Sequence, residues 1–201
     1  MVKRFETREI DDPRVIAAMD RVPRHEFVPI QRQPDAYLDR PLPIGHGQTI
    51  SQPSLVAWMT QLVAPAPGAK ALDVGTGSGY QAAVLAELVK EVYSIEIVEP
   101  LADEARERLS AMGYDNVEVR HGDGYRGWPE QAPFDVIIVA AAPDHVPPAL
   151  VEQLRRGGKM VLPVGTDSQQ LLVIEKGEDG AVSQRNVAAV AFVPMTGESQ
   201  R

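Results

Sequence analysis

The sequence predicts an open α/β sheet that is mostly parallel and ends in an antiparallel strand pair. From Lys70 onward, short apolar segments alternate with glycine turns and helical patterns, as in consecutive βαβ units. Near the C-terminus, two strand-like segments flank Glu178-Asp179-Gly180, a hairpin signal. A chain of 201 residues with 44% hydrophobic and 24% charged residues fits one globular domain. We therefore expect residues 1–201 to form a single domain.

Residues 1–64 are expected to form a helical segment on the substrate side of this domain, before an α/β core over residues 65–201. Asp12 followed by Pro13 is typical of a helix N-cap and first turn. Five prolines predict that residues 23–47 are mostly irregular. The apolar residues between Pro53 and Val63 share one helical face, which predicts a second helix.

The core elements follow from the same patterns. Strands are predicted at residues 70–74, 91–97, within 116–124, at 134–142 and at 159–165. Helices are predicted at residues 80–89, 100–112 and 147–158, the last ending at a glycine pair. The hairpin covers residues 169–194.

Composition excludes several classes of function. Without cysteine there is no disulfide, thiolate nucleophile or cysteine zinc site, and the four histidines lack metal-ligand spacing. A net charge of −8 argues against a nucleic-acid partner. The longest apolar runs are too short to span a membrane, and residues 1–13 lack an apolar signal core. We expect a cytoplasmic, monomeric enzyme with no metal and no membrane partner.

Acidic residues stand at the ends of three predicted strands. Asp73 precedes the turn Gly75-Thr76-Gly77-Ser78-Gly79, Glu96 ends the second strand, and Asp123 follows the third. Ligands of open α/β sheets bind beyond the carboxyl ends of the strands. Glu96 could accept hydrogen bonds from two ribose hydroxyls, and Asp123 could accept one from an adenine amine. Together they predict a nucleoside site.

The glycine spacing favours a methyl donor over a dinucleotide. Dinucleotide sites use G-x-G-x-x-G, whereas residues 75–79 read G-x-G-x-G. The carboxylate of Asp73 would repel a pyrophosphate but would suit a cationic ligand with an amino group. The turn therefore predicts S-adenosyl-L-methionine as the cofactor.

Several segments resemble the protein-L-isoaspartate O-methyltransferases. They are "DRPLPIGHGQTISQP", "ALDVGTGSGYQAAVLAEL", "VYSIEI", "HGDG", "PFDVIIVAAAP" and "LRRGGKMVLPVG", in that order, and "MDRVPRHEFVP" near the start is also similar. "GQTISQP" is the most specific of them. The resemblance extends from about residue 13 to Thr196.

The resemblance implies a Rossmann-like S-adenosylmethionine-dependent methyltransferase fold with helices on both faces of the sheet. It implies methyl transfer to the free α-carboxylate of L-isoaspartyl residues in damaged proteins and peptides, followed by a succinimide that reopens partly to aspartate. Ser51 matches the catalytic serine. The donor residues it implies are Thr49, Ile50, Asp73, Gly75, Thr76, Gly77, Gly79, Tyr80, Glu96, Asp123, Gly124 and Thr196. The substrate residues are Gln48, Thr49, Ile50, Ser51, Ala142 and Val193.

Other interpretations remain open at this point. Ser51 or Gln52 could serve only as the cap of the helix that starts at Pro53. The enzyme could methylate an ordinary aspartate in a dedicated peptide partner. The chain could also be a dinucleotide-binding module, or a silent adaptor that retains the donor fold.

Overall fold

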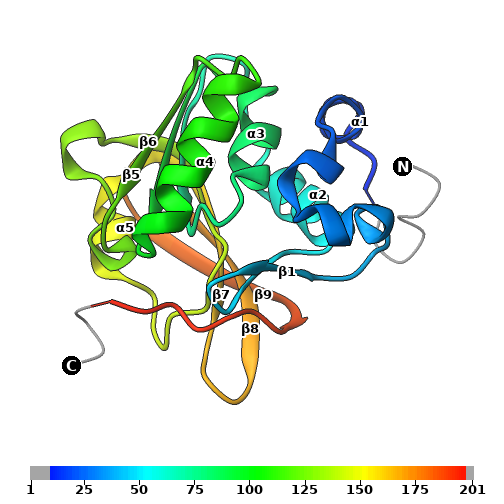
Figure 1. Cartoon of the computed structure of the whole chain (residues 1–201). Coiled ribbons are helices and arrows are strands. Elements are labelled where there is room, and N and C mark those ends of the chain that lie inside the picture. Colours follow the sequence, from blue (N-terminus) through cyan, green and yellow to red (C-terminus); the bar gives the residue numbers. More distant parts are fainter. Residues whose placement is uncertain (1–9, 198–201) are drawn as a thin grey trace.

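The computed structural model describes residues 10–197; the N-terminal residues 1–9, including most of the segment examined for a signal core, lie outside this range. A seven-stranded sheet has the order β5-β4-β3-β6-β7-β8-β9 (Figure 1). Its strands are β3 (Lys70–Val74), β4 (Glu91–Glu96), β5 (Val117–His121), β6 (Phe134–Val139), β7 (Leu154–Val164), β8 (Gln169–Lys176) and β9 (Val182–Val190). Strands β3 to β7 pair in parallel, while β8 pairs antiparallel with both β7 and β9. The predicted mostly parallel sheet with an antiparallel C-terminal pair is confirmed.

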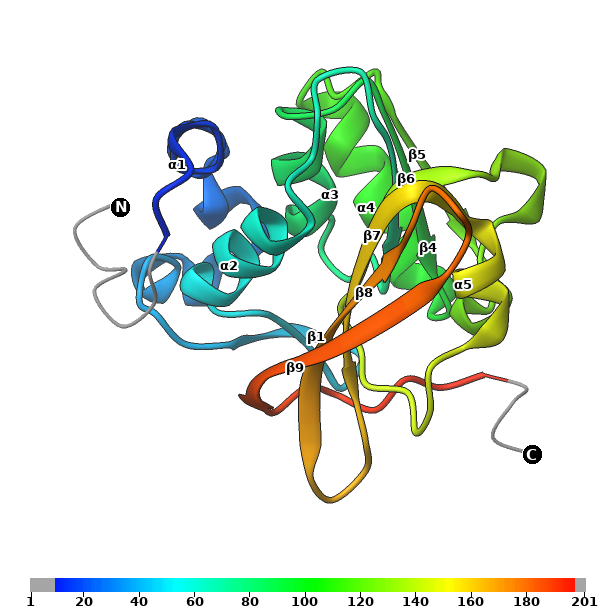
Figure 2. The same ribbon diagram turned by 180° about the vertical axis from the view of Figure 1, so that it is seen from behind.

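Helices cover both faces of this sheet. Helices α2 (Pro53–Val63), α3 (Tyr80–Ala86) and α4 (Glu99–Ala111) pack on one face (Figure 1). The short helix α5 (Pro148–Gln153) lies at the other face (Figure 2). Successive strand residues alternate between two apolar clusters, so Ala71 belongs to the cluster under α2 to α4 and Leu72 to the cluster under α5.

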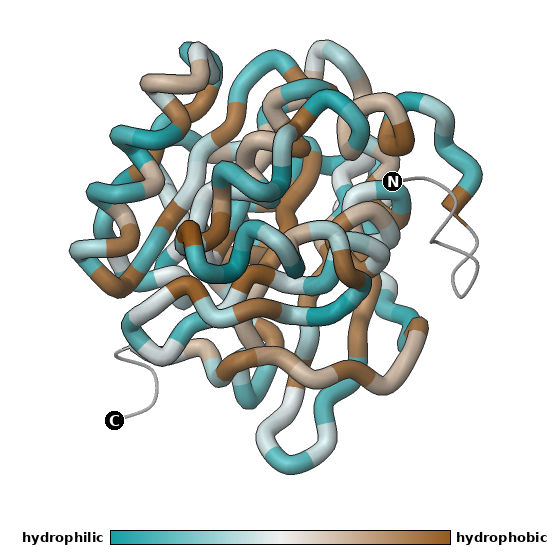
Figure 3. Tube along the Cα trace, turned by 45° about the vertical axis from the view of Figure 1, so that its right-hand side comes forward, coloured by the Kyte–Doolittle hydropathy of each residue, from teal (hydrophilic) through white to brown (hydrophobic). Residues whose placement is uncertain are grey.

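Hydrophobic residues concentrate along the segments that cross the interior, and hydrophilic residues are frequent on the outer helices and loops (Figure 3). Among the described residues, no helix has both the length and the apolar character needed to cross a bilayer.

The helix predicted over residues 147–158 is too long. Helix α5 ends at Gln153, and β7 begins at Leu154, which pairs with Phe134 of β6. Gly158 packs tightly against β6, because a Cβ at this position would lie 2.8 Å from the carbonyl oxygen of Asp135. The glycine pair therefore lies within a strand and does not end a helix.

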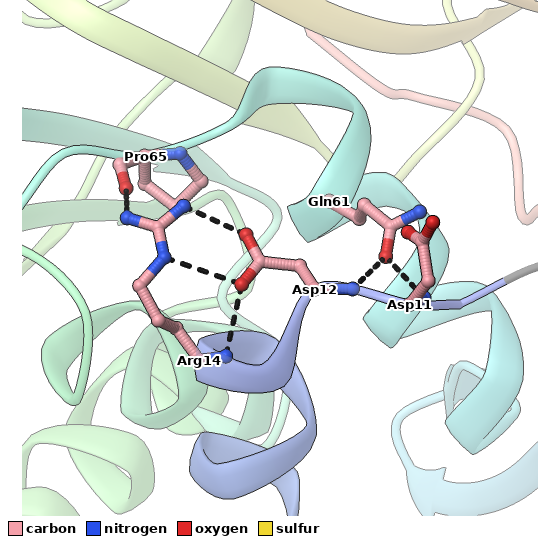
Figure 4. Close-up of polar contacts among 5 residues, drawn as sticks. All are labelled: Asp11, Asp12, Arg14, Gln61 and Pro65. Atoms are coloured by element: carbon pink, nitrogen blue, oxygen red, sulfur yellow. Dashed lines mark hydrogen bonds and ion pairs between the residues drawn. The ribbon is translucent and has the colours of Figure 1, made fainter.

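The first helix is anchored to the second by polar contacts (Figure 4). Helix α1 (Pro13–Arg21) starts as predicted, with the Asp12 carboxylate accepting from Arg14 N at 2.9 Å. Gln61 Oε1 of α2 accepts from the backbone nitrogens of Asp11 and Asp12, both at 2.9 Å. Arg14 Nη1 donates to the carbonyl oxygen of Pro65. These contacts hold the N-terminal segment against the end of α2.

A β-hairpin replaces part of the segment predicted to be irregular. After the 3-10 helices η2 (Arg24–Phe27) and η3 (Ile30–Asp35), strands β1 (Leu42–Gly45) and β2 (Gln48–Ile50) pair antiparallel. Its turn, Gly45-His46-Gly47, has three successive positive φ angles of 97°, 51° and 71°. The two glycines adopt such angles readily, so this turn can bring β2 back along β1.

Candidate active site

A cavity lies at the carboxyl end of the parallel strands, where segments far apart in the sequence meet. The glycine turn after β3, the end of β4, the β1–β2 hairpin and the C-terminal segment all contribute to its wall. The predicted site residues that line it are Gln48, Thr49, Ile50, Ser51, Gly75, Thr76, Gly77, Tyr80, Glu96, Gly124, Val193 and Thr196. Asp73, Gly79, Asp123 and Ala142 lie outside the lining.

The glycine turn is bent sharply and bonded to the neighbouring strand. Gly75, Gly77 and Gly79 have φ angles of 92°, 52° and 89°. The backbone nitrogens of Gly75 and Thr76 both donate to the carbonyl oxygen of Ile95, at 2.8 and 3.1 Å. Gly79 lies behind the cavity wall, where a Cβ would lie 3.1 Å from Leu109 Cδ1. Gly79 thus allows α3 to pack on α4.

Glu96 connects the end of β4 to this turn. Its carboxylate is buried and accepts from Gly77 N through Oε2 at 2.8 Å and from Val98 N through Oε1 at 2.9 Å. A carboxylate has about four acceptor positions. Two therefore remain for a ligand, which suits a pair of ribose hydroxyls.

Asp73 lies beneath the turn at the end of a hydroxyl chain. Ser94 Oγ donates to Asp73 Oδ2 at 2.8 Å, and the hydroxyls of Thr76 and Ser94 are 2.6 Å apart. Oδ1 of this fully buried carboxylate has no hydrogen-bond partner among residues 10–197. Desolvation, with a smaller contribution from Glu96, raises the pKa of Asp73 to about 7. A cation brought close to Asp73 would favour its ionised form.

Asp123 serves first as a local cap. Its Oδ1 accepts from Tyr125 N at 2.9 Å and starts the 3-10 helix η4 (Gly124–Arg126). Gly197 approaches the same carboxylate too closely to accommodate a Cβ. Gly124, the next residue, does line the cavity and leaves no room for a Cβ between Val74 and Met195.

Ser51 faces the cavity and does not cap helix α2. The N-cap residue is Gln52, whose side chain makes no capping bond. The carboxylate of Asp39 performs that role, since Oδ1 accepts from Ser54 N at 2.9 Å. The interpretation of Ser51 as the cap is therefore wrong, whereas Gln52 does occupy the N-cap position but without a side-chain capping bond. Within the described part of the chain, the Ser51 hydroxyl has no hydrogen-bond partner, so it is available to a ligand.

The C-terminal segment closes the cavity from the other side. Ala142 N donates to the carbonyl oxygen of Val193 at 2.8 Å, and Met195 N donates to that of Ala142 at 2.7 Å. Ala142 thus holds the C-terminal segment in place through backbone hydrogen bonds without lining the cavity itself. The residues of this segment that line the cavity are Val193, Pro194, Met195 and Thr196.

Comparison with known proteins identifies the family. The family model described as protein-L-isoaspartate(D-aspartate) O-methyltransferase matches residues 1–200. The chain belongs to this family. The protein-L-isoaspartate O-methyltransferase 2 of Polaromonas sp. is 61% identical over 189 residues, which cover 93% of this chain and 90% of the relative. The protein of the same name from Syntrophobacter fumaroxidans is 59% identical over 188 residues, covering 92% and 76%.

Solved structures give the same family. A protein-L-isoaspartate O-methyltransferase superposes with a TM-score of 0.86 at 28% identity, over 96% of this chain and 64% of that longer chain. A Plasmodium falciparum protein described as a member of this family, in complex with S-adenosyl-L-homocysteine, superposes with a TM-score of 0.82 at 28% identity. That alignment covers 93% of this chain and 92% of the other.

Several residues of the cavity wall were not among the site residues predicted from the sequence. They are Val56, Met59, Val74, Ser78, Gln81, Ile95, Ile97, Ala140, Ala141, Pro194 and Met195. Ala140 could have been found, because it directly follows the apolar strand β6, and ligands of open α/β sheets bind beyond the carboxyl ends of the strands. Met59 and Gln81 had no such signal, since their helical patterns indicate only burial.

No group of three or more histidine, aspartate or glutamate side chains lies close enough to hold a metal ion in the described part of the chain.

Proposed function

We propose that this chain transfers the methyl group of S-adenosyl-L-methionine to the free α-carboxylate of L-isoaspartyl residues in damaged proteins and peptides. Membership of the protein-L-isoaspartate O-methyltransferase family is the observation that carries this proposal. The segment Gln48–Ser51, which is specific to the family, lines the same cavity as the glycine turn, and this supports the proposal.

The residues of the donor end fit a nucleoside that carries an amino acid. Glu96 retains acceptor positions for ribose hydroxyls after binding Gly77 and Val98. Asp73, with Oδ1 unpartnered within residues 10–197, would become ionised when a cationic group binds close to the turn. When bound, the donor supplies an electrophilic methyl group on a positively charged sulfur.

The acceptor end needs orientation more than proton transfer. An α-carboxylate has a reference pKa of about 3.3–3.7, so at neutral pH it is already a nucleophile. Ser51 would donate a hydrogen bond from its hydroxyl to one carboxylate oxygen and leave the other free to attack. A neutral donor reduces the nucleophilicity of the carboxylate less than a lysine would. Such alignment can supply roughly 7–11 kcal/mol of the barrier reduction.

The remaining expectations extend this proposal. Residues 1–64 would form the substrate side and residues 65–201 the donor-binding core of one domain. The cavity supports such an arrangement, because Gln48–Ser51 of the first part and Gly75 and Glu96 of the second both line it. A cytoplasmic location, supported by the absence of cysteine, and a monomeric state remain our expectations.

A pair of peptides tests the function. Two synthetic peptides differ only in an isoaspartyl or an aspartyl linkage, and methyl incorporation from S-adenosyl-L-methionine is measured with both. We expect incorporation into the isoaspartyl peptide alone. Incorporation into the aspartyl peptide would favour an ordinary aspartate as acceptor, and calorimetric binding of NAD without S-adenosyl-L-homocysteine would favour a dinucleotide module.

A further inference from the structure

Arg24 is a charged side chain enclosed in the core. It belongs to η2 and is 0% exposed, and it is the largest of the fully buried side chains. Its Nε donates to the carbonyl oxygen of Ala36 at 2.7 Å. Its two terminal nitrogens, Nη1 and Nη2, have no hydrogen-bond partner among residues 10–197. A buried cation needs compensation from its surroundings.

The ring of Tyr80 provides compensation of a specific kind. The guanidinium carbon of Arg24 lies 4.8 Å from the centroid of this ring, within the range of a cation–π interaction. Burial raises the pKa of the Tyr80 phenol above its ordinary value, so the ring is neutral at physiological pH. The contact is therefore between a buried cation and a neutral aromatic ring.

Tyr80 belongs to the cavity described above. It is the first residue of α3, directly after the glycine turn, and it is one of the residues that line the cavity together with Gly77 and Glu96. Two further contacts of this side chain come from the N-terminal segment. Phe27 packs edge-on with centroids 5.4 Å apart, and the Tyr80 hydroxyl lies 3.9 Å from Met19 Sδ.

We propose that Arg24 is a positioning residue for the donor end of the cavity, where its guanidinium holds the Tyr80 ring in the orientation that forms the wall. Arg24 itself does not line the cavity, so its effect on a ligand passes through this ring. This inference rests on the proposed function only in its use of the donor product as the probe.

Graded fluorination of residue 80 tests the proposal. Tyr80→Phe keeps the ring, and site-specific incorporation of phenylalanine with one, two or three ring fluorines then withdraws electron density from its face. Calorimetry gives the Kd for S-adenosyl-L-homocysteine, which lacks the charged sulfur of the donor. We expect Kd to rise with each fluorine, by about tenfold to thirtyfold across the series. In an Arg24→Met background, Kd should be raised and should no longer depend on fluorine number.

Arg24→Lys provides a second variant if Arg24→Met does not fold. Its shorter, more strongly hydrated ammonium should give a shallower dependence on fluorine number than arginine does. The proposal is overturned if Kd is independent of fluorine number with Arg24 present, or if the dependence is the same after either substitution. Failure of the unsubstituted protein to bind S-adenosyl-L-homocysteine would contradict the proposed function as well.

Discussion

Replacing Asp73 with asparagine should remove a pH dependence from the folding stability of this protein. The carboxylate is 0% exposed, and burial raises its pKa from 3.8 to about 7. Between about pH 4 and pH 7, the unfolded chain has an ionised Asp73, while the folded chain keeps this residue protonated. The folded state then binds more protons, so the contribution of Asp73 to stability falls as pH rises. Above about pH 7 both states are ionised and the contribution is constant.

The size of the effect follows from the shift. One pKa unit corresponds to about 1.4 kcal/mol, so a shift of about three units corresponds to at most about 4 kcal/mol. Relative to Asp73→Asn, the unsubstituted protein should lose up to that amount between about pH 4 and pH 7. Asparagine preserves the shape and the bond from Ser94, although its amide can add a cost that does not vary with pH.

Denaturant unfolding of both proteins at a series of pH values measures this difference. A difference in unfolding free energy that is independent of pH, or that changes in the opposite direction, would refute the reasoning about Asp73. Donor binding adds a second test. If an amino cation lies near Asp73, binding of S-adenosyl-L-homocysteine at pH 6 should release a proton, which calorimetry in buffers of different ionisation enthalpy detects.

Further predictions concern the cavity wall and its support. Ser51→Ala should lower kcat about 10- to 100-fold, because one hydrogen bond to a charged group is lost. The Kd of S-adenosyl-L-homocysteine should stay nearly unchanged. Asp39→Ala should lower the free energy of unfolding by about 1 kcal/mol, because helix α2 loses its side-chain cap, whereas Ser51→Ala should change it by less than about 0.5 kcal/mol. Equal losses in the two variants would assign the capping role to Ser51. Glu96→Gln should weaken the binding of S-adenosyl-L-homocysteine at least about tenfold, because the glutamine amide NH₂ would face a backbone N–H and the negative charge of the carboxylate would be lost. An unchanged Kd in calorimetry would contradict this. Gly124→Ala should lower the free energy of unfolding by about 1–3 kcal/mol and weaken donor binding, because the new Cβ would lie 2.5 Å from Val74 Cγ1. Gly122→Ala is the control that should be tolerated, since a Cβ there would lie 3.5 Å from its nearest neighbour.

The sequence predicted those parts of the fold in which local pattern and packing agree. Helix α2 has the predicted limits, Pro53 and Val63, because a proline starts it and one apolar face repeats throughout. The β1–β2 hairpin was missed, because the prolines favour the interpretation of this segment as irregular and because three successive positive φ angles have no simple sequence signature. The change from α5 to β7 at Leu154 was missed because it depends on pairing with Phe134 of a distant strand.

The donor end of the site was easier to predict than the rest. Parallel strands bring their carboxyl ends together, so Gly75 and Glu96 could be placed side by side from the sequence alone. Met59 and Gln81 reach the same cavity from helices, and only the packing of α2 beside α3 brings them there. The capping role of Asp39 was likewise invisible, because it comes from a loop 15 residues before Ser54.

Oxygen exchange during turnover measures the central claim most directly. Methylation of the free α-carboxylate activates it toward the next backbone nitrogen, which expels methanol and closes a succinimide. Water then reopens this ring and leaves one of its oxygen atoms in the product. With an isoaspartyl peptide in ¹⁸O-labelled water, our account predicts methanol release together with aspartyl peptide that carries at least one ¹⁸O atom, one for each passage through the succinimide. A stable methyl ester, or methylation without ¹⁸O in any product, would contradict it.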